Sequence, residues 1–320
     1  MIEFKDVCAS YATEIPVLRD VSFTINDGDF VAFVGTNGAG KSTTMRLCNG
    51  LIKPTSGEVL IDGVPTTQLR VSEVARKVGF LFQNPDRQIC CETVKDELLF
   101  SFKAQDALDE NAYAKVDEII ETFGFDPEAE PFLLNRGTRQ LLALASIVVM
   151  TPPVVILDEP TTGLDYLECE KVMQIVARLH EAGTTVIMVC HDMEVVASFA
   201  KRVIVMNEGS IVADGATFDV LRNKDAMHKA NLIPPQIVDI AMQLEEQGYG
   251  EVAPNVIAAN TLEEMTGALA TAALNQASLA PAACTHATQQ GGGAQATAAQ
   301  SQAAVAPAAH KTTPQMEGGK

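Results

Sequence analysis

The sequence predicts an α/β protein whose core sheet is mostly parallel. Short apolar segments bounded by turn residues alternate along the chain with segments of helical apolar spacing. A glycine-rich stretch, residues 35–42, stands between one apolar segment and one helical segment. Strands that alternate with helices are typical of a parallel sheet, because parallel neighbours need a crossover connection between them.

The apolar segments are the expected strands. Residues 18–25 and 30–34 are separated by the turn sequence Asn26-Asp27-Gly28-Asp29. Further strands are expected, in chain order, at residues 58–61, 78–82, 154–157 and 185–190, with a hairpin formed by residues 203–206 and 210–213.

The helical segments fill the intervals between these strands. A helical stretch is expected at residues 42–48, and a helix at 167–182 ends at Gly183. Residues 92–150 have a helical pattern that Pro127 and Pro131 interrupt. Near the C-terminus, helical spacing is found again at residues 237–244 and 262–269.

The composition divides the chain into three parts. Residues 1–225 form the predicted α/β domain, with a helical subdomain at about 92–150, and residues 226–272 form a short helical segment. Residues 273–320 are rich in Ala, Gln, Thr, Pro and Gly. Few large apolar side chains remain there to offset the entropy of ordering, so we predict that this tail is disordered.

Composition and charge exclude several functional classes. The 320 residues carry a formal net charge of −18, which disfavours general nucleic-acid binding. No window contains 18 uninterrupted apolar residues, and residues 1–6 lack the basic and apolar regions of a signal peptide. Seven cysteines are an odd number for a disulfide framework. We therefore expect a cytoplasmic protein without a membrane span.

The glycine-rich stretch fits a phosphate-binding loop. Residues 35–42 are GTNGAGKS, which matches G-x-x-x-x-G-K-[ST] between a strand and a helix. Glycines let backbone N–H groups turn toward phosphate oxygens, and the helix N-terminus adds a favourable potential. We expect Lys41 to reach the β- and γ-phosphates and the Ser42 hydroxyl to hold Mg²⁺.

A second functional pattern is an apolar strand that ends in two carboxylates. Residues 154–157 precede Asp158 and Glu159. Downstream of a phosphate-binding loop on the same sheet, Asp158 is placed to bind Mg²⁺ and Glu159 to polarise an attacking water.

Together these motifs resemble an ABC-type ATPase subunit over roughly residues 1–270. Tyr11 stands where the family has an aromatic residue that stacks on adenine, and Gln83 in FQNPD resembles the glutamine loop that touches Mg²⁺ and water. Residues 157–165, LDEPTTGLD, resemble the Walker B segment and the D-loop, with Asp165 as the D-loop aspartate. His191 fits the switch histidine that contacts the γ-phosphate. The resemblance implies a P-loop cassette with an antiparallel β subdomain and a helical subdomain.

One family motif is altered. The signature Leu-Ser-Gly-Gly-Gln should precede the Walker B strand by about two dozen residues, and that place has Leu-Asn-Arg-Gly-Thr at 134–138. Asn135 can cap the following helix as Ser would, and Gly137 keeps backbone N–H donors available. Arg136 is bulky where the backbone would approach a nucleotide. Because family members bind each nucleotide between one subunit's P-loop and the other's signature, we expect a heterodimer with one impaired site.

The glutamine-loop context places the resemblance in one branch of the family. FQNPDRQI at 82–89, followed by Thr93-Val94, is similar to the energy-coupling factor and cobalt-type importers. The segment LIPPQI at 232–237 resembles that group's dimerising extension, which assigns this role to residues 226–272. The resemblance implies uptake of a vitamin or transition metal, powered by ATP hydrolysis.

The resemblance also implies partners and a place in the cell. These are a second ATPase subunit with an intact signature, a membrane coupling protein that docks at residues 83–100, and a substrate-binding membrane protein, at the cytoplasmic face of the membrane. ATP and Mg²⁺ are the expected ligands. The nucleotide site is expected to comprise Tyr11, Gly35, Asn37, Gly38, Gly40, Lys41, Ser42, Thr43, Asn135, Gly137 and Asp165, with Glu159, His191 and Gln83 in catalysis and Ser42, Asp158 and Gln83 at the metal.

Other ABC classes remain as alternatives. The chain could serve a different ABC transporter, an exporter included, or act as a soluble ATPase in translation, repair or chromosome structure. The single P-loop and the lack of sustained heptads or Cys-x-x-Cys pairs weigh against the soluble class. A regulatory subunit that binds ATP without hydrolysing it is a further alternative.

Overall fold

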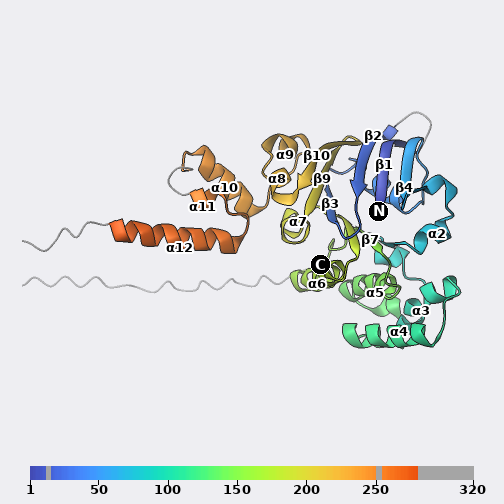
Figure 1. Ribbon diagram of the computed structural model, residues 1–320. Helices are drawn as coiled ribbons and strands as arrows, with labels where there is room; N and C mark the ends of the chain where they lie inside the picture. The colour runs from blue at the N-terminus through green and yellow to red at the C-terminus, as the bar shows by residue number, and fades with distance from the viewer. Residues whose placement is uncertain (12–15, 250–253, 280–320) are drawn as a thin grey trace, which may run out of the picture. The chain divides into compact units, whose positions relative to one another are not determined.

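A computed structural model of the chain describes residues 1–11, 16–249 and 254–279 (Figure 1). Met1–Ala273 form one compact unit, and the chain from Leu274 onward is assigned to a second, of which the structure describes residues 274–279.

The centre of the first unit is a six-stranded sheet with the order β10-β9-β3-β8-β7-β6. The pairs β9–β3, β3–β8, β8–β7 and β7–β6 are parallel, and β9 and β10 form an antiparallel hairpin. This confirms the predicted α/β class and the hairpin. The strands are β3 (Phe30–Val34), β6 (Val78–Leu81), β7 (Val154–Asp158), β8 (Thr185–Val189), β9 (Arg202–Asn207) and β10 (Ser210–Ala216).

A smaller, antiparallel sheet has the order β2-β1-β4-β5, which confirms the expected antiparallel β subdomain. Its strands are β1 (Ile2–Ser10), β2 (Pro16–Ile25), β4 (Ser56–Ile61) and β5 (Val64–Pro65). β1 was not among the predicted strands. Its pairing shifts register after Phe4, and Asp6 has φ 48°, so polar residues fall where apolar ones would continue the alternation.

Helices cover the core sheet and form a separate helical subdomain. Those near the sheets are α1 (Lys41–Cys48), α2 (Val71–Ala75), α6 (Tyr166–Glu181), α7 (Met193–Phe199), α8 (Thr217–Leu221) and α9 (Lys224–Lys229). The subdomain comprises α3 (Val94–Ala104), α4 (Glu110–Phe123) and α5 (Arg136–Val148), within the predicted range (Figure 1). Short 3₁₀ turns lie at Thr66–Gln68, Pro85–Arg87 (η2) and Pro131–Leu133.

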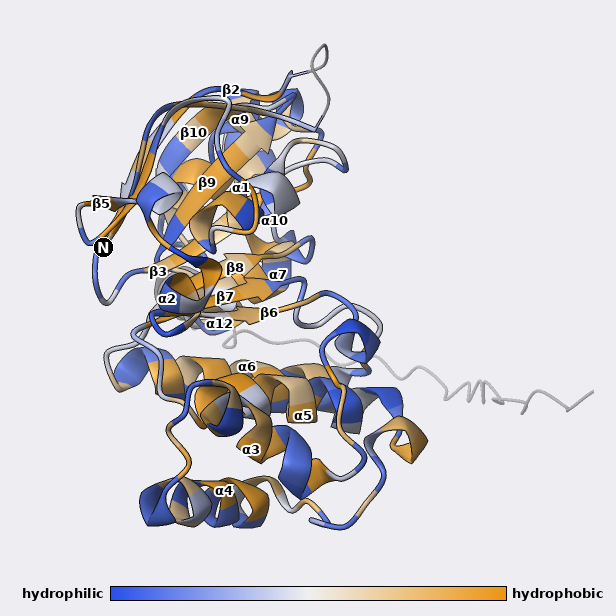
Figure 2. Cartoon of the chain, turned by 90° about the vertical axis from the view of Figure 1, so that its right-hand side faces the viewer, coloured by the Kyte–Doolittle hydropathy of each residue, from blue (hydrophilic) through white to orange (hydrophobic). Residues whose placement is uncertain are grey.

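Both faces of the central strand are buried. In β3, Phe30, Ala32 and Val34 belong to the apolar cluster that also contains residues of α5 and α6. Val31 and Phe33, on the other face, pack with the antiparallel sheet and α1. Alternation of side chains along the strand therefore fills two cores, and Figure 2 shows the core strands as largely hydrophobic ribbons.

The last part of the unit contains α10 (Gln236–Glu246), α11 (Pro254–Ile257) and, up to Ala273, the larger part of α12 (Leu262–Leu279). Ala241, Val256, Ala259 and Met265 form a small core there. The helices expected at 237–244 and 262–269 are confirmed. α12 continues to Leu279, past the predicted start of disorder at residue 273. The rest of that predicted tail, residues 280–320, lies outside the described residues.

Within the described ranges, no helix combines the length and apolarity needed to cross a membrane.

The sheet topology brings the predicted motifs to one edge. Four neighbouring strands, in the order β3-β8-β7-β6, run parallel, so their carboxyl ends meet at the same side of the sheet. The phosphate-binding loop follows β3, Asp158 ends β7, and His191 and Gln83 come shortly after β8 and β6. Such carboxyl ends are the usual ligand-binding edge of open α/β sheets.

Candidate active site

The loop between β3 and α1 has a backbone that two glycines make possible. Gly35 has φ 146°, and a Cβ there would lie 2.1 Å from the carbonyl oxygen of Met206. Gly40 has φ 102° at the start of α1, where a Cβ would lie 2.5 Å from a methyl group of Leu18. Any side chain at these positions would collide with neighbouring atoms, so the loop can wrap closely around a ligand only with glycine here.

Lys41 is folded across this loop. Its ammonium donates hydrogen bonds to the carbonyl oxygens of Gly35, at 2.7 Å, and Thr36, at 2.9 Å. The side chain is buried, and burial lowers the pKa of Lys41, while the carboxylates of Glu159 and Asp158 act in the opposite direction. The ammonium is therefore held at the loop by groups that anionic phosphate oxygens could replace.

Asp158 lies at the end of β7, opposite the start of α1. The Ser42 hydroxyl is 3.5 Å from Asp158 Oδ1, a long contact for an O–H donor. Burial, and then the nearby charge of Glu159, raise the pKa of Asp158. A buried carboxylate beside a hydroxyl, which Lys41 and Arg46 stabilise only through their charge at a distance, suits a hard divalent cation such as Mg²⁺.

Glu159 is the centre of a hydrogen-bond network. Its Oε2 accepts bonds from Gln83 Nε2 at 2.7 Å and from Thr162 Oγ1 at 3.0 Å. Its Oε1 lies 2.9 Å from His191 Nε2, within hydrogen-bond distance. Gln83 thus contacts Glu159, and no hydrogen bond in the described ranges joins it to Asp158. Thr162 was not predicted; it lies three residues after Glu159, and only the turn between them brings its hydroxyl back to the carboxylate.

These groups surround a cavity of about 150 Å³. The residues that line it are Val17, Asn37, Gly38, Ala39, Gly40, Lys41, Ser42, Thr43, Glu159 and His191. The structure therefore brings together the P-loop and two of the three predicted catalytic side chains at one small hollow. Gln83 reaches it through Glu159.

Tyr11 lies beside the start of α1. Its hydroxyl is 3.2 Å from Thr43 Oγ1 and accepts a hydrogen bond of 3.2 Å from Arg46. The residue is 58% exposed, so a ligand can reach it. Its contact with adenine stays a prediction.

The altered signature forms the start of α5. Asn135 is the N-cap, because its Oδ1 accepts the Thr138 N–H at 2.8 Å, as predicted. Arg136 turns toward the D-loop and donates from Nη2 to the Thr162 carbonyl oxygen at 2.9 Å. A Cβ on Gly163 would lie 2.8 Å from the Arg136 guanidinium carbon. Arg136 therefore fills the space next to Thr162, whose hydroxyl donates to Glu159.

Gly137 and Asp165 join the starts of α5 and α6. A Cβ on Gly137 would lie 2.0 Å from a carboxylate oxygen of Glu168. Asp165 caps α6 by accepting the Glu168 N–H at 2.9 Å, and Glu168 accepts the Asp165 N–H in return. In the described part of the chain, no hydrogen bond links Asn135, Gly137 or Asp165 directly to the P-loop. Their contact with nucleotide stays a prediction.

A parallel sheet with this loop at β3 and a carboxylate pair at β7 defines the chain as a P-loop nucleoside triphosphatase of α/β type. The family model described as ABC transporter matches residues 18–162. The energy-coupling factor transporter ATP-binding protein EcfA of Methanothermobacter thermautotrophicus is 35% identical over 253 residues, which cover 78% of this chain and 81% of that protein.

Two further similarities agree with this result. A protein of Caldanaerobacter subterraneus named as an ABC transporter ATP-binding protein, TTE1589, is 40% identical over 247 residues. That match covers 76% of this chain but 43% of the relative, so the chain spans less than half of that protein. The structure of cbiO1 from Clostridium perfringens, described as part of the complex cbiONQ, has a TM-score of 0.65 and 28% identity over 77% of this chain and 98% of that one.

The chain belongs to the ABC transporter family, among the ATP-binding subunits of energy-coupling factor transporters. The predicted class, cassette fold and ATPase activity are thereby confirmed.

Proposed function

We propose that this ATPase subunit binds Mg–ATP at the loop of residues 35–42 and uses Glu159 to activate the attacking water. The observation that carries this proposal is the convergence of Gln83, Thr162 and His191 on one carboxylate, which lines the same cavity as Lys41 and Ser42. A carboxylate fixed by several donors is a positioned base, and positioning supplies much of the rate in phosphoryl transfer.

Binding would rearrange the loop little. The Lys41 ammonium exchanges the carbonyl oxygens of Gly35 and Thr36 for phosphate oxygens, and the N–H groups at the start of α1 face the same charge. Ser42 and Asp158 would hold Mg²⁺, with Gln83 beside it. The ion supplies neutralisation of the charge that develops on the phosphate oxygens. The exposed ring of Tyr11 takes adenine.

The test is the variant Glu159→Gln, which keeps the size and hydrogen-bonding capacity of the side chain but removes the base. We expect ATP binding to persist and the hydrolysis rate to fall by roughly 10²–10⁴-fold. Glu170→Gln, an exposed position on α6, is the matched control. Unchanged turnover in Glu159→Gln would refute the role of Glu159.

We further propose that the chain works beside a second ATPase subunit with an intact signature. Support comes from Arg136, whose guanidinium packs against Gly163 where a signature glycine would leave the backbone open. The nucleotide bound to this chain meets an intact set of residues, namely the P-loop, Asp158, Glu159 and His191. The nucleotide bound to the partner subunit meets the altered signature of this chain. One site of the pair is then impaired.

The transport partners we propose are a membrane coupling protein and a substrate-binding membrane protein, which place the chain at the cytoplasmic face of the membrane. A cavity of about 450 Å³ between the core and the helical subdomain supports docking at residues 83–100. Phe80, Phe82 and Phe100 line it, and Phe100 is 46% exposed. The cargo we propose is a vitamin or a transition metal ion.

Affinity purification from native membranes tests this assembly. We expect to recover a hydrophobic coupling subunit with the wild-type chain and to lose it with Phe100→Asp. The exposed residue Tyr113 on α4, changed to Asp, serves as the control because it does not line the cavity. Recovery of soluble partners alone would contradict the transport role.

A further inference from the structure

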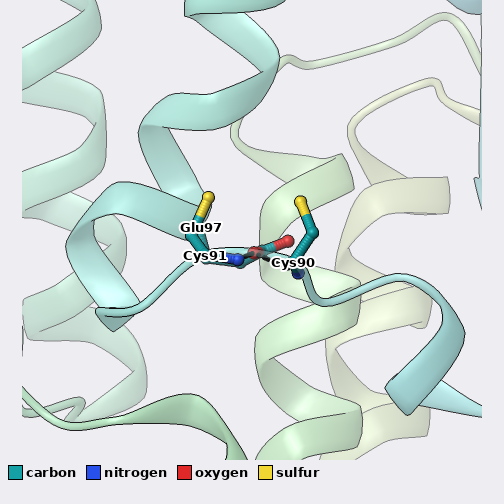
Figure 3. Close-up of side chains that lie close together, drawn as sticks. All are labelled: Cys90, Cys91 and Glu97. Carbon is teal, nitrogen blue, oxygen red and sulfur yellow. Dashed lines mark hydrogen bonds between the residues drawn. The ribbon is translucent and has the colours of Figure 1, made fainter.

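A second cluster of chemically reactive groups lies away from the nucleotide site. Cys90 and Cys91 stand in the loop between η2 and α3, and Glu97 is in the first turn of α3. One sulfur from each cysteine and one carboxylate oxygen all lie within 4.8 Å of one another. Figure 3 shows the two thiols projecting to the same side of the loop.

Glu97 holds this loop in place. Its Oε2 accepts the backbone N–H groups of both Cys90 and Cys91, each at 2.9 Å. These two bonds fix the peptide that joins the cysteines and therefore the directions in which both side chains leave it. The two thiols are positioned as a pair before any ligand arrives, which lowers the entropic cost of binding one.

The charge of Glu97 has no cationic partner among the ion pairs of the described residues. The side chain is 3% exposed, and both backbone N–H groups that it accepts bond to Oε2, while the thiols of Cys90 and Cys91 also lie within hydrogen-bonding reach of the carboxylate. Buried charges are costly unless they are paired or coordinate a metal. The two backbone N–H groups and the start of α3 supply hydrogen bonds and a favourable potential at Glu97, but no opposite charge.

We propose that Cys90, Cys91 and Glu97 form a binding site for a thiophilic divalent cation, of which Zn²⁺ and Cd²⁺ are the natural probes. Two sulfurs and one carboxylate oxygen are the donor set of such ions, with water in the fourth position. Two sulfurs at about 2.3 Å from one tetrahedral ion lie about 3.8 Å apart. The cluster therefore needs a contraction of at most about 1 Å, and the exposed side of Cys90 gives the ion access.

The binding step is a proton exchange without electron transfer. The cation takes the place of the two thiol protons, which pass to the buffer, and forms two metal–sulfur bonds and one metal–oxygen bond. Burial, followed by the charge of Glu97, raises the pKa of Cys91 to about 12, and the pKa of Cys90 is raised for the same reasons. An ordinary cysteine thiol titrates at about pH 8.5, so at neutral pH both groups carry their protons and binding releases two protons per ion.

The position of the site separates it from the nucleotide chemistry. Glu97 also lines the cavity of about 450 Å³ between the core and the helical subdomain, so a bound ion would stand at the wall of that cavity. The site uses none of the residues assigned to ATP or Mg²⁺. Its existence does not depend on the proposed transport function.

The experiment is a titration of the full-length chain with Cd²⁺ alone, without nucleotide, monitored by the sulfur-to-cadmium charge-transfer band and by proton release in weak buffer. We expect one ion per chain and two protons per ion. The double variant Cys90→Ser/Cys91→Ser should lose the band, and Glu97→Gln should weaken binding by roughly 10–100-fold or more.

Control variants decide whether the thiols of this cluster are responsible. Cys8→Ser/Cys169→Ser removes two other partly exposed thiols, and Cys284→Ser removes one outside the described residues; each should leave the titration unchanged. Unfolding temperatures of all variants exclude loss of fold as the cause. A band that persists without Cys90 and Cys91, or the absence of a stoichiometric band in the wild-type chain, would overturn the proposal.

Discussion

Glu159 has a backbone conformation that matches the role proposed for it. Its φ of 53° lies in the left-handed region, which costs a residue other than glycine about 1–3 kcal/mol. The Glu159 N–H donates to the Val189 carbonyl oxygen at 3.0 Å, so the neighbouring strand holds the residue in place. Asp158 therefore ends the strand in regular geometry, and the chain then turns sharply to aim the next carboxylate at the loop. Two adjacent acids acquire different environments in this way.

The residue-level prediction that follows concerns Thr162. Its hydroxyl donates to Glu159 at 3.0 Å, and a single hydrogen bond to a charged group contributes about 1.5–3 kcal/mol. Thr162→Val removes that donor at nearly constant volume, so kcat should fall by about tenfold or more while nucleotide binding stays close to wild type. Thr162→Ser restores the donor and should recover most of the rate in a steady-state ATPase assay. If Thr162→Ser is as slow as Thr162→Val, the hydroxyl is not the cause.

A second prediction uses the raised pKa of Asp158. Its pKa in the folded state lies above the ordinary value of 3.8, so the ionised form is less stable in the folded chain than in the unfolded one. This penalty is complete well above the folded-state pKa and disappears as the pH falls toward 3.8. Asp158→Asn should therefore raise the unfolding temperature at neutral pH, with a gain that shrinks in acid, and it should abolish Mg²⁺-dependent hydrolysis. Thermal scans across this pH range without Mg²⁺ or nucleotide would detect it, and an unchanged unfolding temperature at neutral pH would contradict it.

The motifs predicted part of this network, because their chemistry depends on residue type at a fixed spacing. Lys41, Ser42, Asp158 and Glu159 could be assigned from the loop and the strand end alone. Thr162 could not, because a hydroxyl in a loop gains its role from the turn that brings it back to Glu159. The Cys90 and Cys91 pair gave no metal-ligand pattern in the sequence, since the third donor reaches it through a loop conformation that spacing does not specify.

At the scale of elements, the contact between β6 and α5 positions the glutamine loop. Gly79, within β6, is packed so closely that a Cβ there would lie 2.3 Å from a methyl group of Ile147 in α5 and 3.0 Å from the Pro152 ring. Neither neighbour is the flexible end of a long side chain. The strand can therefore approach the helix only because this position has no side chain, and Gln83 follows shortly after the end of this strand.

Gly79→Ala should accordingly destabilise the fold. Inserting one methyl group into a well-packed contact costs about 1–3 kcal/mol, which denaturant unfolding at constant m-value would measure. Gly267→Ala is the matched control, because a Cβ at Gly267 in α12 meets nothing within 4 Å and alanine favours a helix. The control should be neutral or slightly stabilising. Equal stability of both variants would show that β6 and α5 can separate without cost.

The sequence predicted the elements of the core better than those of the edge. Strands β3, β7 and β8 are continuous apolar runs because both of their faces are buried, and such runs are easy to recognise. The pairing of β1 with β2 shifts register three times after Phe4, and Asp6 has a positive φ, so the apolar positions of β1 lose the period of two on which recognition depends. The prediction of an antiparallel β subdomain therefore depended on the family resemblance and not on an alternating pattern in β1.

At the scale of the whole molecule, half of the net negative charge lies in the helical subdomain and not at the P-loop. Residues 92–131, within the helical subdomain, contain three lysines and twelve acidic residues, which is half of the net charge of −18. The P-loop instead presents Lys41 and the start of α1, which has no acidic residue in its first turn. The local field, and not the net charge, decides whether an anion binds.

The whole-molecule prediction concerns the altered signature and the need for a partner. If Arg136 blocks the signature from a second subunit's nucleotide, restoring the family motif should make the chain self-sufficient. The variant Asn135→Ser/Arg136→Gly/Thr138→Gln removes the guanidinium that contacts Thr162 and Gly163, and serine keeps the cap of α5. We expect the ATPase rate of the purified chain to rise by roughly tenfold or more, the effect of gaining one preorganised set of donors at the transferred phosphate.

Two comparisons make this outcome specific. Asn135→Ser alone preserves the cap without reopening the motif, so its rate should stay low. Mixing this chain, with its natural signature, with a subunit that carries an intact signature should raise the ATPase rate. The gain comes from the site that this chain's P-loop forms with the partner's signature, so Glu159→Gln in this chain should remove it. Arg136 also holds the backbone at Thr162, so removing it could slow this chain's own site. The ATPase rate of the triple variant rises only if reopening the signature gains more than the loss of this contact costs. A wild-type chain that is fully active alone would show that Arg136 is compatible with a working signature, and the heterodimer would lose its physical basis.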